Sequence, residues 1–212
     1  MSESHREPAQ TDIKIVDSLE RLTHVLRQLL WDKAKEVHLS PIQIQFLLFL
    51  KDRALEHCRV SYLAEEFGLT QATVSDAIRV LTEKEFLNKE PHPDDRRIQT
   101  LILTRKGANL VRKLENWQAP LIRQVMELPE EDKSRVLLFL MKLIVSLQRS
   151  EVIASARICM ACQHFRPFMH DDPAAPHHCT LTDTPLAIQD FKLDCPFHKP
   201  EPGGKEVLKK VP

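Results

Sequence analysis

One stretch of the 212-residue chain, Val60 to Gly107, constrains the fold more than any other. It opens with apolar residues at helical spacing that end at Gly68, and Thr70 then provides a side-chain oxygen to cap a second helix. The apolar face of that second helix consists of Val74, Ile78 and Leu81. The pattern predicts two short helices joined by a tight turn, the second packed through one face.

The opposite face of the second helix carries short hydrogen-bonding side chains and one long cation. With the capping threonine, these residues are Thr70, Gln71, Thr73, Ser75 and Arg79. Such side chains meet base edges and phosphates when a helix enters the major groove of DNA. We therefore predict that this face binds DNA, with Thr70 and the helix start at a phosphate. Plain solvent exposure is the alternative for each of them, and for Arg79 above all.

A charged hairpin follows the two helices. Phe86–Lys89 and Ile98–Thr104 predict its two strands, which are separated by a proline-framed turn. Arg96 and Arg97 lie at the tip, from which guanidinium groups can reach a minor groove narrowed at A·T base pairs. We expect Asp95 to orient one of these two arginines rather than to contact DNA itself.

This order of elements resembles the winged helix-turn-helix of the MarR family of bacterial regulators. The residues that carry the resemblance are Leu63-Ala64-Glu65, Gly68-Leu69-Thr70, Thr73-Val74-Ser75, Leu81, Glu83-Lys84, Asp95-Arg96-Arg97, Leu101, Leu103-Thr104 and Gly107. The resemblance implies a mainly helical fold and a sequence-specific DNA-binding regulator, most often a repressor. It also implies a homodimer, interlocked through the first and the last two helices, on a pseudo-palindromic stretch of double-stranded DNA. A small-molecule effector in the cleft between the dimer helices and the winged domain is a possible further partner.

Two features depart from the family pattern. Glu85 stands where the family usually has a glycine, and a glutamate adopts positive φ less readily. The segment from Tyr62 to Gly107 holds seven Lys and Arg against eight Asp and Glu, a net charge of −1. DNA binding must therefore depend on where the cations point and not on their total.

The composition favours a helical protein of one or two domains. The chain has only four glycines, and its formal net charge of zero does not require a polyanionic partner. The longest apolar run, Val136–Leu147, is short and contains Lys142, which predicts a buried helix and not a membrane span. Because the first ten residues are polar and do not form a secretory signal, we expect a cytoplasmic protein.

Helices are also predicted on both sides of the central motif. Residues 12–36 have the pattern of a long amphipathic helix, and Ser40-Pro41 starts the next one. Thr104 caps a helix that runs to about Leu128, which Pro120 should kink or interrupt. We divide the chain into a flexible leader (1–11), a winged-helix domain with dimerisation helices (12–156), a cysteine-rich module (157–198) and a disordered tail (199–212).

Eight of the fourteen prolines and four of the five cysteines lie beyond Arg157, in the cysteine-rich module and the tail. These cysteines are Cys159, Cys162, Cys179 and Cys195. Cys-x-x-Cys is a two-ligand hook, and four thiolates complete the tetrahedral shell of a structural zinc ion. A module this small has little core of its own, so a metal would supply much of its folding free energy. We expect that core to contain Leu181, Leu186, Ile188, Phe191 and Leu193.

Other interpretations of the module remain open. An iron–sulfur cluster is the main alternative to zinc, because four cysteines ligate either and a proline follows Cys195. A cluster would make the module a redox sensor that controls DNA binding, whereas a structural zinc would leave DNA binding indifferent to oxidants. His178 or His198 could replace a cysteine as ligand, and free thiols or a disulfide would need no metal.

We do not expect an enzyme. A catalytic zinc keeps one position open for water and has a carboxylate base nearby, whereas four cysteines would close the shell. A metalloenzyme is therefore a less favoured interpretation of these four cysteines than a structural or sensing metal site. Cys58 is remote from the other cysteines, which predicts a core thiol, with a redox-sensing thiol as the second interpretation.

Overall fold

The computed structural model describes residues 7–51, 53–153 and 156–201. Contacts divide the chain into two compact units, one up to Val60 together with Ala72–Arg123, the other Ser61–Gln71 together with the chain from Gln124 onward. Part of the predicted leader (1–6) and most of the predicted tail (202–212) lie outside the described residues. The four-part division by composition remains a prediction.

The first two helices lie where the sequence predicts them: the first extends slightly beyond the expected 12–36, and the second begins at Ser40-Pro41. Helix α1 spans Gln10–Val37 and ends where His38 adopts a left-handed φ of 53°. Helix α2 spans Pro41–Leu50, and the Ser40 hydroxyl accepts a hydrogen bond from the Gln43 amide. The Gln43 side chain in turn accepts a hydrogen bond from the Ser40 amide at 2.9 Å. This reciprocal cap satisfies two amides at the helix start, which is why the sequence signal was reliable.

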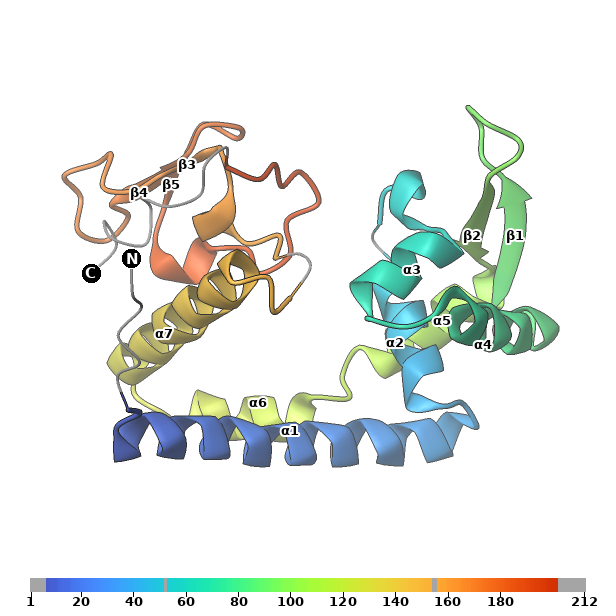
Figure 1. Cartoon of the computed structure of the whole chain (residues 1–212), viewed down its shortest axis with the longest axis horizontal. Helices are drawn as coiled ribbons and strands as arrows, with labels where there is room; N and C mark the ends of the chain where they lie inside the picture. Colours follow the sequence, from blue (N-terminus) through green and yellow to red (C-terminus); the bar gives the residue numbers. More distant parts are fainter. Residues whose placement is uncertain (1–6, 52, 154–155, 202–212) are drawn as a thin grey trace. The chain divides into compact units, whose positions relative to one another are not determined.

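Helix α4 (Gln71–Glu83) and the antiparallel strands β1 (Leu87–Pro91) and β2 (Gln99–Leu103) follow in chain order (Figure 1). The amide of Leu101 in β2 also donates to the carbonyl of Cys58, just after the short 3-10 helix η1 (Leu55–His57). Fully buried aliphatic and aromatic side chains form the core of this unit, among them Ile44, Phe46, Leu47, Val74, Ile78, Leu81, Leu87 and Leu114. The predicted inward face of α4 is therefore confirmed.

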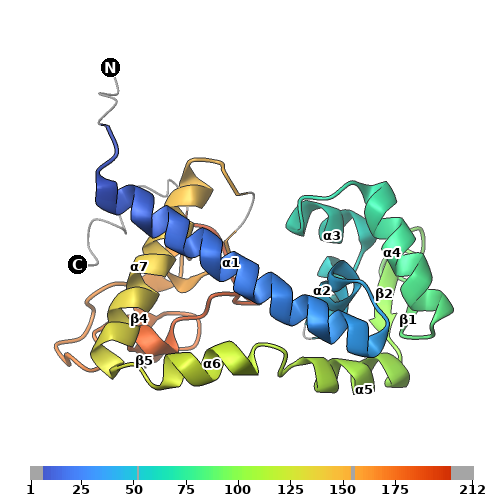
Figure 2. The ribbon, with the colours of Figure 1, turned by 90° about the horizontal axis from the view of Figure 1, so that it is seen from below.

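The helix predicted from Thr104 to about Leu128 is interrupted near Pro120, as expected. Helix α5 spans Arg105–Leu114, and α6 resumes at Ala119 and ends at Met126 (Figure 2). Thr104 caps α5 as predicted, since its Oγ1 accepts a hydrogen bond from the Gly107 amide at 3.0 Å. The break comprises residues 115–118, and Pro120 lies in the first turn of α6, where its missing amide hydrogen costs no intrahelical hydrogen bond.

The second unit contains α3 (Val60–Glu66), the long helix α7 (Glu130–Arg149) and the cysteine module. The elements of the module are η2 (Cys159–Ala161), β3 (Phe165–Arg166), β4 (His177–Cys179), β5 (Thr184–Leu186) and η3 (Ile188–Asp190). The three strands form an antiparallel sheet in the order β3-β4-β5.

Helix α7 carries the longest apolar run of the sequence but is not buried all round. Val136 and Phe139 are 54% and 43% exposed, whereas Met141 and Val145 are buried. In the part of the chain that the structure describes, we find no helix with the length and apolar character that crossing a bilayer requires.

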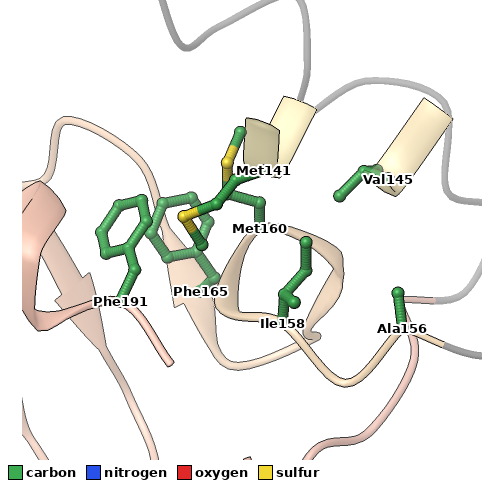
Figure 3. Packing of buried hydrophobic residues seen from close by; sticks show 7 residues of the cluster. All are labelled: Met141, Val145, Ala156, Ile158, Met160, Phe165 and Phe191. Atoms are coloured by element: carbon green, nitrogen blue, oxygen red, sulfur yellow. The ribbon is translucent and has the colours of Figure 1, made fainter. Parts of the chain in front are cut away.

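The core of the cysteine module includes side chains of α7. Its buried residues are Met141 and Val145 from α7 with Ala156, Ile158, Met160, Phe165 and Phe191 (Figure 3). The rings of Phe165 and Phe191 meet edge to face, with centroids 5.1 Å apart. The prediction that Leu181 and Leu193 fill this core is wrong, because they are 46% and 52% exposed. Two residues of the cysteine hook region, Ile158 and Met160, take their place.

Candidate nucleic-acid interface and four-cysteine module

The turn between α3 and α4 is closed by backbone hydrogen bonds. The amide of Gly68 donates to the Glu65 carbonyl, and that of Leu69 donates to the Ala64 carbonyl at 2.8 Å. Gly68 has a φ of +61°, which costs a glycine little. The turn thus places Thr70 immediately before the first residue of α4.

Helix α4 separates its packing face from its polar face. Val74 and Ile78 have no exposed surface. The polar residues predicted to bind DNA on and next to this helix are all exposed, namely Thr70, Gln71, Thr73, Ser75 and Arg79. A helix that enters the major groove must present such a face to solvent in the free protein.

Arg79 is held along α4 by two acidic residues. Its Nη1 lies 2.9 Å from Glu83 Oε1, and its Nη2 lies 3.8 Å from Asp76 Oδ1. The hydrogen bond to Glu83, with the negative charges of both acids, raises the pKa of Arg79. Ion pairs this exposed are weak, so a phosphate can replace Glu83 as the partner of the guanidinium.

The hairpin of β1 and β2 presents Arg96 and Arg97 at its tip, and both are exposed. The Asp95 carboxylate accepts two hydrogen bonds from the Arg97 guanidinium. Nε donates to Oδ1 and Nη2 donates to Oδ2, both at 3.0 Å. Asp95 Oδ1 also accepts from the Arg97 amide, and these hydrogen bonds lower the pKa of Asp95. Because the Arg97 side chain stays 91% exposed, the carboxylate directs the guanidinium without covering it.

Glu85 adopts the left-handed turn that a glycine would favour. Its φ is +63°, and the next amide, of Phe86, donates back to the Leu81 carbonyl at 2.9 Å. The Glu85 carbonyl accepts a hydrogen bond from Thr104 Oγ1 at 2.7 Å, and its carboxylate pairs with Lys106 at 3.0 Å. The turn into the wing is therefore kept, and these contacts offset part of the backbone strain.

Gly107 allows the start of α5 to lie close to the backbone of Phe86, the residue before β1. A Cβ at this position would lie 2.1 Å from the carbonyl oxygen of Phe86, which no real contact allows. The same carbonyl accepts the amide of Thr104 at 3.1 Å. Only glycine fits where these two backbone segments meet.

Part of the chain just described is similar to a known family. Residues 39–98 match the MarR family. The matched segment runs from the residue before Ser40 through α2, α3, α4 and β1 to the wing tip. The HTH-type transcriptional regulator YhbI of Bacillus subtilis is 33% identical over 84 residues, which are 38% of this chain and 54% of that protein. The chain thus spans about half the length of this relative.

Solved structures share the fold over a larger part of the chain. The S. aureus MepR–DNA complex is similar with a TM-score of 0.53 and 23% identity, over 61% of this chain and 95% of that one. BldR from Sulfolobus solfataricus is similar with a TM-score of 0.52 and 18% identity, over 65% of this chain and 98% of that one. At these identities the similarity establishes a mainly helical, MarR-like winged helix fold.

Beyond the MarR-like helices, backbone hydrogen bonds bring the four cysteine-bearing segments together. The Cys159 amide donates to the Lys192 carbonyl at 3.1 Å, and the Cys195 amide donates to the Arg157 carbonyl at 2.8 Å. In the three-stranded sheet, Cys179 pairs with Phe165. Because Phe165 follows Cys162 by three residues, this pairing brings Cys179 near the Cys-x-x-Cys segment. All five cysteines of the chain are free thiols.

Two of the thiols accept hydrogen bonds from nearby groups. Burial raises the pKa of Cys159, an amide hydrogen bond from Lys192 at 3.2 Å opposes this, and the other three cysteines raise the pKa further. Burial also opposes ionisation of Cys179, but hydrogen bonds from Thr182 and from the Leu181 amide lower its pKa overall. Lys192 gave no signal in the sequence, because it acts on Cys159 through its backbone.

The histidines considered as alternative ligands have other partners. His178 Nε2 lies 3.3 Å from Asp183 Oδ1, and its Nδ1 lies 3.1 Å from His170 Nε2. His198 Nε2 lies 3.2 Å from the Ala161 carbonyl oxygen, and burial lowers the pKa of His198. Within the described ranges, no three His, Cys, Asp or Glu side chains are so arranged that they could hold a metal ion.

Cys58 has the surroundings of a core thiol. It is 3% exposed, and its Sγ faces the carbonyl oxygens of Arg53 and Ala54 at 3.8 and 3.5 Å. Burial raises the pKa of Cys58. Because the thiolate is the reactive form, this environment favours the core-thiol interpretation over redox sensing.

Proposed function

We propose that the protein is a sequence-specific DNA-binding transcriptional regulator that acts as a repressor. The observation that carries this proposal is the simultaneous exposure of the polar face of α4 and of the arginine-bearing wing tip on a MarR-like fold. The S. aureus protein MepR, whose fold is similar, has been solved as a DNA complex.

The side chains divide into those that read bases and those that position the protein. Gln71, Thr73 and Ser75 are short enough to meet base edges from a helix in the major groove. Thr70 and the start of α4 meet a phosphate, where the helix N-terminus favours an anion. When the protein binds DNA, the Arg79 guanidinium leaves the Glu83 carboxylate and pairs with a phosphate. Arg96 and Arg97 extend the contact into the adjacent minor groove.

A homodimer is part of the same proposal. Large apolar side chains are exposed on three helices, namely Ile13, Val16, Leu22 and Val25 on α1, Ile122, Val125 and Met126 on α6, and Val136 and Phe139 on α7. A second copy of the chain would remove such groups from water, and these are the helices that the family uses for dimerisation. A two-fold axis would then present two α4 helices to successive major grooves, about 34 Å apart.

Two further parts of the proposal concern ligands. A cavity of about 390 Å³ beside α1 and α2, lined in part by Trp31, His38 and Pro41, is large enough for a small-molecule effector. The four cysteines of the C-terminal module are proposed to bind a metal, either zinc or, in the alternative, an iron–sulfur cluster whose state alters DNA affinity. We propose no catalytic activity for the protein, because a shell of four thiolates leaves no open position for water.

DNA binding is tested with the full-length protein and a labelled duplex of its own promoter region. Anisotropy is measured over a series of salt concentrations, and the logarithm of the affinity should fall linearly with the logarithm of salt. Arg97→Ala should weaken binding about tenfold and reduce the slope by about one. Arg112→Ala removes the same charge from α5, outside α4 and the wing, and should change little. Absence of salt-sensitive binding, or equal effects of the two variants, would overturn the proposal.

Dimerisation is tested separately by light scattering on the eluting protein. Leu22→Glu places a charge on the exposed apolar face of α1 and should give a monomer. Thr23→Glu introduces the same charge one residue further along α1 and serves as the matched control. If both variants elute as dimers, α1 is not part of the interface.

A further inference from the structure

We propose that Arg157 is a positioning residue for DNA binding, because its guanidinium ties the cysteine module to α3, the first helix of the helix-turn-helix. This inference rests on the proposed DNA-binding function, and it is independent of metal binding. It gives the C-terminal module a role in that function. The module limits the movement of the helix that leads into α4.

The Arg157 guanidinium binds two segments that are distant from it in the sequence. Its Nε donates to Asp194 Oδ1 at 2.8 Å, in the C-terminal part of the module. Its Nη2 lies 3.3 Å from Glu66 Oε1 at the end of α3, and its Nη1 donates to the Tyr62 hydroxyl one turn earlier. The guanidinium carbon also lies 5.7 Å from the centre of the Tyr62 ring. One side chain therefore joins two turns of α3 to the module.

These contacts lie within one compact unit and are shielded from water. The second unit contains both Ser61–Gln71 and the chain from Gln124 onward. The Arg157 side chain is 10% exposed, although arginine side chains are rarely buried unless they are paired. Its backbone is held as well, since its carbonyl accepts the Cys195 amide at 2.8 Å. Removal of this guanidinium would leave two carboxylates without their cation.

Helix α3 lacks a positive charge of its own at its end. It finishes with Glu65 and Glu66, and its last turn contains no basic residue. The C-terminal end of a helix carries a partial negative charge, so acidic side chains are unfavourable there and cations are favourable. Arg157 supplies the cation from the module. It also compensates Glu66 in a segment, Tyr62 to Gly107, whose net charge of −1 opposes the approach of DNA.

Apolar packing does not fill the space beside this contact. A cavity of about 690 Å³ is lined in part by Tyr62 and Glu66 of α3 and by residues 151–153, which follow α7. A polar contact next to a cavity can be broken without unpacking a core, so loss of Arg157 should loosen α3 while the module stays folded. The turn transmits this movement towards α4, because the Leu69 amide donates to the Ala64 carbonyl at 2.8 Å.

The first test measures DNA binding of the full-length protein to the labelled promoter duplex. Arg157→Gln should lower the affinity about fivefold at fixed salt. The salt slope should stay the same, because Arg157 positions α3 and does not itself pair with a phosphate. Arg157→Lys keeps the charge but lacks the planar fork that reaches several partners, so it should restore only part of the loss. Arg166→Gln removes the same charge from an exposed position in the module and should change neither quantity.

The second test measures hydrogen exchange of the α3 amides without DNA, and so reports the contact itself. Exchange in residues 61–67 should be faster in Arg157→Gln and in Tyr62→Phe, which removes only the hydroxyl that accepts from Arg157. The effects of the two substitutions should not add, because they break one contact. Protection of β4 should remain as in the wild type. If Arg157→Gln fails to fold, Tyr62→Phe still tests the contact.

The outcomes separate this inference from the proposed function. Wild-type protein that binds no DNA would overturn the proposed function and, with it, the role of Arg157 in DNA binding. Wild-type binding with equal affinity in Arg157→Gln would overturn the inference alone, as would unchanged exchange of α3 in both variants. A salt slope reduced by about one in Arg157→Gln would mean that Arg157 itself meets a phosphate, which also contradicts a positioning role.

Discussion

In the winged-helix region, the core and the candidate binding face lie on opposite sides of one helix, whereas in the cysteine module they alternate along one short segment. Ile78 is fully buried in α4, while Arg79 next to it is exposed. In the hook, Ile158 and Met160 are fully buried, and the candidate ligand Cys159 lies between them. Helical spacing thus keeps the polar face of α4 apart from its core, whereas in the hook the candidate ligand Cys159 lies directly between two core residues.

The two regions also differ in what stabilises them. The winged helix has a sizeable set of fully buried aliphatic and aromatic side chains. Among the residues that the structure describes, the apolar cluster of the module comprises seven buried side chains, and α7 provides two of them. Apolar burial is roughly proportional to area, so the smaller core provides less stabilisation and makes a bound ion more important.

Removal of the metal should separate the two regions most clearly. A structural zinc ion contributes on the order of 10 kcal/mol to the folding of a small domain, so a chelator should unfold the module. The winged helix, which has its own core, should keep its thermal transition within a few degrees. Hydrogen exchange of backbone amides reports both regions at once. Equal loss of protection in α4 and in β4 would contradict independent stabilisation.

Reciprocal core substitutions should each affect one region. Ile78→Ala and Met160→Ala both truncate a side chain with no exposed surface, and each should cost about 2–5 kcal/mol of unfolding free energy. The loss should appear in the winged helix for the first variant and in the module for the second. Urea unfolding followed by hydrogen exchange distinguishes them. If Met160→Ala also destabilised α4, the two regions would be one cooperative unit.

A glycine at position 85 should stabilise the winged helix alone. Glu85 has a φ of +63°, so Glu85→Gly should relieve backbone strain and gain about 0.5–1 kcal/mol after the entropy cost of glycine. Glu85→Ala removes the same pair with Lys106 but keeps the Cβ, and it should give no gain. Scanning calorimetry of both variants checks this. A gain in Glu85→Ala would show that the side chain, and not the backbone, is unfavourable.

Release of Arg79 should have the smallest effect, and only on DNA binding. In Glu83→Gln the guanidinium loses its partner at 2.9 Å, so binding should tighten by about two- to five-fold at low salt. Glu20→Gln on α1 changes net charge equally and should tighten binding less. Unfolding of the module should be the same in both variants. If the two variants bound DNA equally well, net charge alone would explain the gain.

The sequence by itself determined the local elements of the protein. Ser40 and Thr104 cap α2 and α5, and Gly68 closes the turn before α4, as predicted. The exposed polar face of α4 and the wing tip were also located correctly, because both follow from helical or strand periodicity and turn chemistry. Such signals act between residues a few positions apart, which is why the sequence reveals them.

Only the tertiary structure decided which distant segments complete the cysteine module. Spacing suggested a metal site, but nothing in it indicated that Met141 and Val145 of α7 would complete the core while Leu181 and Leu193 stay exposed. Likewise, the amide that Lys192 aims at Cys159 comes from the pairing of two segments more than thirty residues apart. Contacts of this range depend on how all the segments pack at once, and no local pattern records them.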